Sequence, residues 1–100
     1  MNINREKIKS DLVIDSDFIN YGIIDGHITV VHNASLESHG IIGGNVHIEP
    51  GCTFSCYGTV NGNIYNAGLL RLFGTLNGQI DNVGDVQIDP NAVINKTKFQ

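Results

Sequence analysis

The chain has few of the residues that mark the more familiar kinds of site. Of its 100 residues two are cysteine, two are proline, none is tryptophan, and 16% are charged. Cys52 and Cys56 are too few for a disulfide framework and lack a second pair with which to bind zinc, so we expect both to be reduced thiols. We place Cys52 in the core as a small apolar residue and Cys56 at a more exposed corner.

Basic residues and long apolar runs are also scarce. The net charge is −4, and Arg71 is the only basic residue between positions 11 and 95. A surface for DNA or RNA is therefore not expected. No apolar run approaches the length of a membrane span, and the first ten residues lack the apolar core of a signal peptide. We expect a cytoplasmic protein that does not insert into a membrane.

One eight-residue phrase occurs four times. Its copies are YGIIDGHI, HGIIGGNV, YGTVNGNI and FGTLNGQI, and they begin at Tyr21, His39, Tyr57 and Phe73. The starting positions are 18, 18 and 16 residues apart. Self-similarity at a nearly fixed period indicates a repeat architecture, in which each repeat is one structural unit that stacks on the next.

Apolar residues inside each repeat alternate with polar ones, as they do in short strands. Breaks of about four residues, rich in Gly and Asn, indicate corners between the strands. One such coil cannot bury its apolar side chains alone, whereas stacked coils collect equivalent side chains into columns. The predicted columns are Ile24, Ile42, Val60 and Leu76; Ile28, Val46, Ile64 and Ile80; Val30, Ile48, Ala67 and Val83; Ala34, Cys52, Leu70 and Val86; and Leu36, Phe54, Leu72 and Ile88.

The pattern predicts an all-β fold, a single-stranded right-handed β-helix (a solenoid) of about five coils of 16–18 residues. The right-handed form is favoured because the apolar spacing alternates between two and four, whereas left-handed β-helices follow a six-residue repeat. Residues 11–95 are predicted to form the β-helix, with 11–20 as an incomplete first coil. Residues 1–10 are predicted to be a polar arm or cap, and residues 96–100 an end segment. Residues 86–95 also repeat residues 46–55 at an offset of 40.

The segments GTVNGNI (58–64), GTLNGQI (74–80), VHIEPGCTF and VQIDPNAVI give the chain a resemblance to the bactofilins, a family of bacterial cytoskeletal proteins. The resemblance covers about residues 12–95. It implies a right-handed, three-sided β-helix that polymerises end to end without nucleotide. A terminal aromatic residue of that family corresponds to Phe99 here. Bactofilins commonly carry longer polar tails than the ones in this sequence.

The ends of a β-helix are the first candidate sites, because each end exposes unpaired strand edges and an open core. Either the ends stack on another copy, or residues 1–10 and 95–100 fold back as caps. The side chains expected to line the two ends are Leu12, Ile14, Phe18 and Ile19 at one and Val93, Ile94 and Phe99 at the other.

The first residue of each phrase supplies a second candidate, a column of Tyr21, His39, Tyr57 and Phe73. We expect these rings to stack and set the register between coils; the alternative is an exposed stripe that recognises a partner. His27 and His47 lack an ordered third ligand, so no metal is expected. The sequence has no nucleophile–base set, phosphate loop or hexapeptide period, and we expect neither a cofactor nor an enzyme.

Two functions remain open at this point. The first is a bactofilin-like structural protein whose partner is itself, through filaments joined at the terminal coils. The second is a compact acidic binding module, such as an inhibitor or immunity protein, that binds another protein through one face of the β-helix.

Overall fold

The structure, a computed structural model, describes residues 2–95. They form three parallel sheets and no helix. Sheet A consists of β1 (Asn2–Asn4), β4 (Phe18–Asn20), β7 (Ser35–Ser38), β10 (Thr53–Cys56), β13 (Leu69–Leu72) and β16 (Asp85–Ile88). Sheet B consists of β2 (Lys7–Ile8), β5 (Ile23–Ile24), β8 (Ile41–Ile42), β11 (Thr59–Val60), β14 (Thr75–Leu76) and β17 (Val93–Ile94). Sheet C consists of β3 (Leu12–Ile14), β6 (Ile28–Val30), β9 (Val46–Ile48), β12 (Ile64–Asn66) and β15 (Ile80–Asn82).

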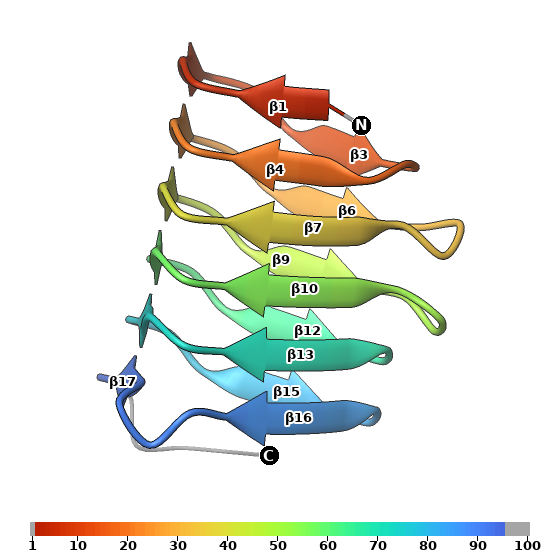
Figure 1. Ribbon diagram of the computed structural model, residues 1–100, viewed down its shortest axis with the longest axis vertical. Coiled ribbons are helices and arrows are strands. Elements are labelled where there is room, and N and C mark those ends of the chain that lie inside the picture. Colours follow the sequence, from red (N-terminus) through yellow and green to blue (C-terminus); the bar gives the residue numbers. More distant parts are fainter. Residues whose placement is uncertain (1, 96–100) are drawn as a thin grey trace.

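The chain visits the sheets in the order A, B, C and then begins the next coil, so each strand pairs with its counterparts in the coils before and after it. The described residues make five complete coils and the first two strands of a sixth. In Figure 1 the near strands run to the left and the far strands to the right while the chain descends, which makes the coils right-handed. The predicted β-helix is confirmed, with slightly more coils than the five expected.

The solenoid begins earlier than predicted. Asn2–Asn4 pair with Phe18–Asn20, and Lys7–Ile8 pair with Ile23–Ile24. The first coil therefore starts at Asn2, and residues 2–8 are part of the sheets, not an arm or cap. The sequence obscured this coil because Ile8 is its only apolar residue that occupies an inward column before Leu12.

The core is a set of columns that run the length of the solenoid. Its buried residues are mostly aliphatic, with Phe54 as the largest fully buried side chain. The inward columns, read from the strand register, are Phe18, Leu36, Phe54, Leu70 and Val86; Asn20, Ser38, Cys56, Leu72 and Ile88; Ile8, Ile24, Ile42, Val60, Leu76 and Ile94; Leu12, Ile28, Val46, Ile64 and Ile80; and Ile14, Val30, Ile48, Asn66 and Asn82.

Three of the predicted columns, one before the C–A corner and two after it, were wrong beyond residue 66. Leu72 and Ile88 continue the column of Ser38 and Cys56, not that of Leu36 and Phe54. Leu70 pairs with Phe54 and not with Cys52, and the counterpart of Ile48 is Asn66, not Ala67. The counterpart of Asn66 is likewise Asn82, while Val83 is 85% exposed. The cause is the corner between sheets C and A, which has four residues in 31–34 and 49–52 but two in 67–68 and 83–84. The 16-residue coils lose their two residues there, and this shifts the register after the corner.

The wide corner has the same backbone hydrogen bond each time it occurs. The N–H groups of Ala34, Cys52 and Ala92 each donate to the carbonyl three residues earlier, at 3.0–3.1 Å. The third case, residues 89–92, joins sheets A and B instead of C and A. This explains the repeat at an offset of 40: it marks one type of turn used at two different corners of the solenoid.

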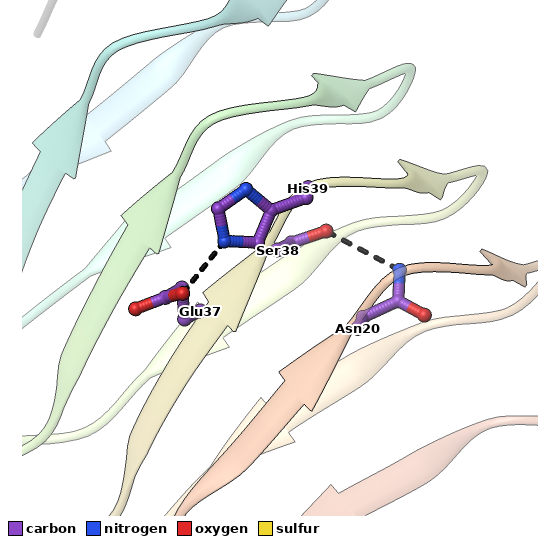
Figure 2. Close-up of polar contacts among 4 residues, drawn as sticks. All are labelled: Asn20, Glu37, Ser38 and His39. Carbon is purple, nitrogen blue, oxygen red and sulfur yellow. Dashed lines mark hydrogen bonds and ion pairs between the residues drawn. The ribbon is translucent and has the colours of Figure 1, made fainter. Parts of the chain in front are cut away.

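Inward asparagines stabilise the narrow corners. The Oδ1 atom of Asn20 accepts a hydrogen bond from the Gly22 N–H, and its Nδ2 donates to the Gly22 carbonyl, at 3.1 and 3.2 Å. Asn66 forms the same pair of hydrogen bonds with Gly68, and Asn82 forms it with Gly84. Asn20 also donates to the hydroxyl of Ser38 in the next coil at 3.3 Å (Figure 2). Amides thus occupy the core only where corner and neighbouring coil satisfy them.

Glycine at the second position of the A–B corner is required by the close approach of successive coils. A Cβ atom on Gly58 would lie 2.0 Å from the carbonyl oxygen of Gly40 in the coil before it. The contact is with backbone, so it cannot be relieved by a change of rotamer. Gly43, in the next corner, is different: its nearest neighbour would be the flexible side chain of Asp25 at 3.1 Å.

We expect Gly58→Ala to destabilise the protein by about 1–3 kcal/mol, because it forces two stacked coils apart. Chemical denaturation followed by circular dichroism measures this change. Gly43→Ala is the matched control and should change the free energy of unfolding by less than about 0.5 kcal/mol. Equal effects of the two substitutions would show that coil spacing does not determine the choice of glycine.

Candidate functional site

The N-terminal end of the solenoid exposes the outer edges of β1, β2 and β3. The inward side chains of this coil are Asn4, Ile8, Leu12 and Ile14, of which Ile14 is buried and the others are half-buried. Leu12 and Ile14 therefore lie in the terminal coil, as predicted. Phe18 and Ile19 do not, because β1 covers their strand, with Asn2 beside Phe18 and Ile3 beside Ile19.

At the other end the last described strands are β16 in sheet A, β17 in sheet B and β15 in sheet C. Ile94 is inward and half-buried beside Leu76, whereas Val93 is on the outer face and 47% exposed. Ile88 continues a core column but is 41% exposed, because no described strand of sheet A follows it. The prediction for Phe99 falls outside the described residues.

The aromatic column forms a continuous stack along the A–B corner. Ring centroids of Tyr21 and His39 are 5.1 Å apart, those of His39 and Tyr57 4.8 Å, and those of Tyr57 and Phe73 4.7 Å, with interplanar angles of 4–14°. The separations match the spacing of neighbouring parallel strands, so each ring packs on the ring of the next coil. The rings therefore stack in register between coils, as the sequence predicted. Their stacking does not depend on a partner protein.

Cations and an acid border this stack. The guanidinium carbon of Arg5 lies 5.3 Å from the centroid of the Tyr21 ring, and that of Arg71 lies 5.5 Å from the centroid of Phe73. Both are within the range of cation–π attraction. In the middle of the stack Nε2 of His39 lies 2.6 Å from Oε2 of Glu37 (Figure 2). Sequence analysis found the four rings but not the arginine on either side.

A shallow groove of about 510 Å³ crosses the outer face of sheet C. The wide corner at Glu49 and Pro50 forms one wall above the narrow corner at Ala67, and the rings of His47 and Tyr65 stack 4.6 Å apart within it. Asp81 adds a second carboxylate to its lining. The groove results from the change in corner width between adjacent coils, a feature that the sequence prediction did not include.

His27 takes part in a series of hydrogen bonds between coils. Nδ1 of His27 accepts a hydrogen bond from the Asn45 N–H at 2.8 Å, in a series where Asp11, Asn45 and Asn63 each accept from the next coil in the same way. Within residues 2–95 no three His, Cys, Asp or Glu side chains are grouped so as to hold a metal ion.

Both cysteines lie in the core, which corrects the placement of Cys56 at an exposed corner. Cys56 is the last residue of β10, and its side chain stacks inward between those of Ser38 and Leu72. Burial raises the pKa of the Cys56 thiol from 9.0 to about 12, although a hydrogen bond with the backbone of Gly58 acts in the opposite direction.

Comparison with models of protein families, with curated proteins and with solved structures found no match to this chain. No helix in the described part of the chain is long and apolar enough to cross a membrane.

The raised pKa of Cys56 predicts a loss of stability at alkaline pH. The unfolded thiol ionises near pH 9.0 and the folded one near 12, so this contribution is complete below pH 9 and is lost as the pH rises from 9 to 12. Cys56→Ser is the matched variant, since Ser38 occupies the same column one coil earlier. Between pH 9 and 10 the free energy of unfolding should fall by about 1 kcal/mol more in the wild type than in the variant. Parallel pH profiles in urea denaturation would contradict the prediction.

Proposed function

We propose that the protein is a non-enzymatic structural protein, similar to the bactofilins, that assembles end to end through its terminal coils into filaments without nucleotide. The observation that carries this proposal is the state of the two ends. Among residues 2–95, each end has strands of sheets A and B with an unpaired edge, beside inward apolar residues that are half-buried or exposed.

The physical argument concerns the partners that these edges lack within the described chain. In the middle of the solenoid every strand has two neighbours, whereas β1, β2, β16 and β17 have one each. An unpaired edge leaves backbone N–H and C=O groups available to another strand. Joining two ends supplies those bonds and at the same time removes Ile8, Ile88 and Ile94 from water.

The resemblance to the bactofilins supports the same function. The segments that carry it, 58–64 and 74–80, are corners and strands of sheets B and C in successive coils. They are elements of a stack in which the strands of successive coils repeat in register. A polymer made of such units needs no conformational change in order to grow, and this is consistent with assembly that consumes no nucleotide.

We expect the purified wild type to form filaments visible by electron microscopy, and Ile94→Arg to prevent them, because the arginine places a charge in an apolar column at the joint. Static light scattering over a range of protein concentrations measures the effect. Val83→Arg is the matched control: this residue is 85% exposed at a C–A corner, so the added charge stays in water and filaments should persist.

Circular dichroism of the Ile94→Arg protein must show the wild-type β spectrum, so that loss of filaments is not loss of fold. Ile88→Lys provides a second substitution at the same end, on a side chain that is already partly exposed. A wild type that stays monomeric at every concentration would refute assembly.

The second candidate function is an acidic protein-binding module, and the groove on sheet C is the observation that favours it. Two carboxylates, Glu49 and Asp81, lie in its lining together with the stacked His47 and Tyr65 rings. Carboxylates beside aromatic faces suit a basic side chain, which gains both an ion pair and a cation–π contact. The partner would then be a protein that presents lysine or arginine to this face.

An oligolysine peptide tests this second function. We expect it to shift the amide NMR signals around Tyr65 and Ala67 in the wild type, and the shifts to fall at least several-fold in Glu49→Gln/Asp81→Asn. Asp15→Asn/Asp25→Asn removes the same charge from exposed residues outside the groove and should bind like the wild type. Shifts that fall equally in both double variants would indicate non-specific attraction and exclude a binding groove.

A further inference from the structure

We infer that the groove on sheet C binds an arginine side chain of another protein, whose guanidinium packs on the open face of the Tyr65 ring and pairs with the carboxylate of Asp81. This inference rests on the second candidate function and names the chemical group that the partner presents. It does not depend on assembly through the ends of the solenoid.

The four-ring stack at the A–B corner shows what this chain itself places on the open face of a stacked ring. Each outer ring of that stack, Tyr21 and Phe73, has a neighbouring ring against one face. The guanidinium of Arg5 lies over Tyr21 and that of Arg71 lies over Phe73. Because one face of each ring is already covered, the guanidinium takes the other. Both ends of this stack therefore carry an arginine.

The second stack, formed by His47 and Tyr65, carries no such cation. Its ring centroids are 4.6 Å apart, so one face of Tyr65 is covered by His47. The residue in register with Tyr65 in the next coil is Asp81, and no lysine or arginine of residues 2–95 lies over the Tyr65 ring. The place beside Tyr21 that Arg5 occupies is thus taken by an acid beside Tyr65.

Hollows lie on both sides of the pair formed by Tyr65 and Asp81. The groove of about 510 Å³ lies towards the C–A corner, where its lining includes Ala67. A smaller hollow of about 200 Å³ lies towards the B–C corner, where the same pair is joined by Asn63 and Gln79. The side chain of Asp81 is shorter than that of tyrosine and does not reach the outer part of the ring. A flat group can therefore lie on that part of the face.

The charges around this space are negative. Glu49 and Asp81 both belong to the lining of the groove and are exposed, and neither has an ion-pair partner among residues 2–95. The lining contains no lysine or arginine. A cation that enters the groove therefore meets two carboxylates without a competing ion pair, which favours a basic partner.

A guanidinium suits this arrangement better than an ammonium. It is planar, so its face can stack on the outer part of the Tyr65 ring while the N–H groups along its edge donate to the Asp81 carboxylate. An ammonium is compact and strongly hydrated, and it has no flat face with which to stack. The two cations that this chain places over its own rings are both arginine.

The shape of the groove favours an arginine on a protein surface over a free small molecule. Sites for small molecules usually enclose most of the ligand, whereas this groove is shallow. A side chain that reaches in from a partner can lay its apolar stem along Pro50 and Ala67, which line the groove, and bring its charged end to Asp81.

Two tripeptides of equal charge test the preference, acetyl-Gly-Arg-Gly-amide and acetyl-Gly-Lys-Gly-amide. NMR titration of the wild type, followed at the amide signals of Tyr65, Ala67 and Asp81, measures both dissociation constants. We expect the arginine peptide to bind about fivefold more tightly. Equal dissociation constants would refute the arginine site and leave an acidic groove that does not select between basic side chains. If neither peptide shifts any signal, the binding function on which the inference rests fails as well.

Substitutions identify the groups that make the preference. Tyr65→Phe keeps the ring face and should keep the fivefold difference, whereas with Tyr65→Leu the two peptides should bind alike. Asp81→Asn should weaken binding of the arginine peptide about tenfold. Asp25→Asn is the matched control, because Asp25 is exposed and outside the groove, and it should bind like the wild type. A preference that survives in Tyr65→Leu, with a wild-type circular dichroism spectrum, would contradict packing on the ring.

Asp81→Arg tests the open ring face without any peptide. It places an arginine in register with Tyr65, as Arg5 is in register with Tyr21, whose N–H donates to the Asn4 carbonyl. The new guanidinium should then pack on the Tyr65 ring and raise the urea midpoint of unfolding above that of Asp81→Ala. A midpoint no higher than that of Asp81→Ala would show that this face does not accept a guanidinium.

Discussion

The structure depends on one constraint: each coil must present the same backbone edge, at the same level, to the coil that follows it. The backbone hydrogen bonds between parallel strands run through the whole solenoid. They are needed because strands of two to four residues have no stability alone. Because the bonds repeat in register, like side chains meet like side chains, and this produces the aliphatic columns, the aromatic stack and the series of side-chain bonds from Asp11 to Gln79. The glycines at the corners follow from the same spacing, since a Cβ on Gly58 would meet the backbone of the coil before it.

Variation is confined to the corners, because that is where a coil can lengthen without losing register. The four-residue corners at 31–34, 49–52 and 89–92 close with the same hydrogen bond and leave the strands on either side aligned. Each change from a wide to a narrow corner makes a step on the surface. One step, at Glu49 and Pro50 above Ala67, forms the groove on sheet C. The surface features of this protein are therefore consequences of corner width on an otherwise uniform prism.

Within the described residues, the first and last coils have a neighbouring coil on one side only. A globular fold closes its core on all sides, whereas a solenoid leaves two cross-sections whose composition is that of the interior. The aromatic column shows the result on the outside of the molecule: stacked rings occupy the middle levels, and Arg5 and Asp89 occupy the first and last. In the proposed filament, polymer growth and internal folding use the same interaction, the pairing of one coil with another.

Sequence by itself determined the type of fold, the strand and corner periodicity, the rings of the aromatic stack, two of the five core columns along their whole length and the first members of the other three. Those properties depend on local alternation and on a period that is visible in the residues. It misplaced Cys56, Ala67, Leu70 and Leu72, and it missed the first coil. A local match such as that between residues 46–55 and 86–95 identifies a turn but not the side of the solenoid on which it occurs. Only the tertiary structure showed which corner this turn occupies, because its position in the coil depends on the lengths of all the corners before it. It also showed that polar residues 2–8 are a coil, because their strands are held by pairing with β4 and β5 and not by apolar side chains of their own.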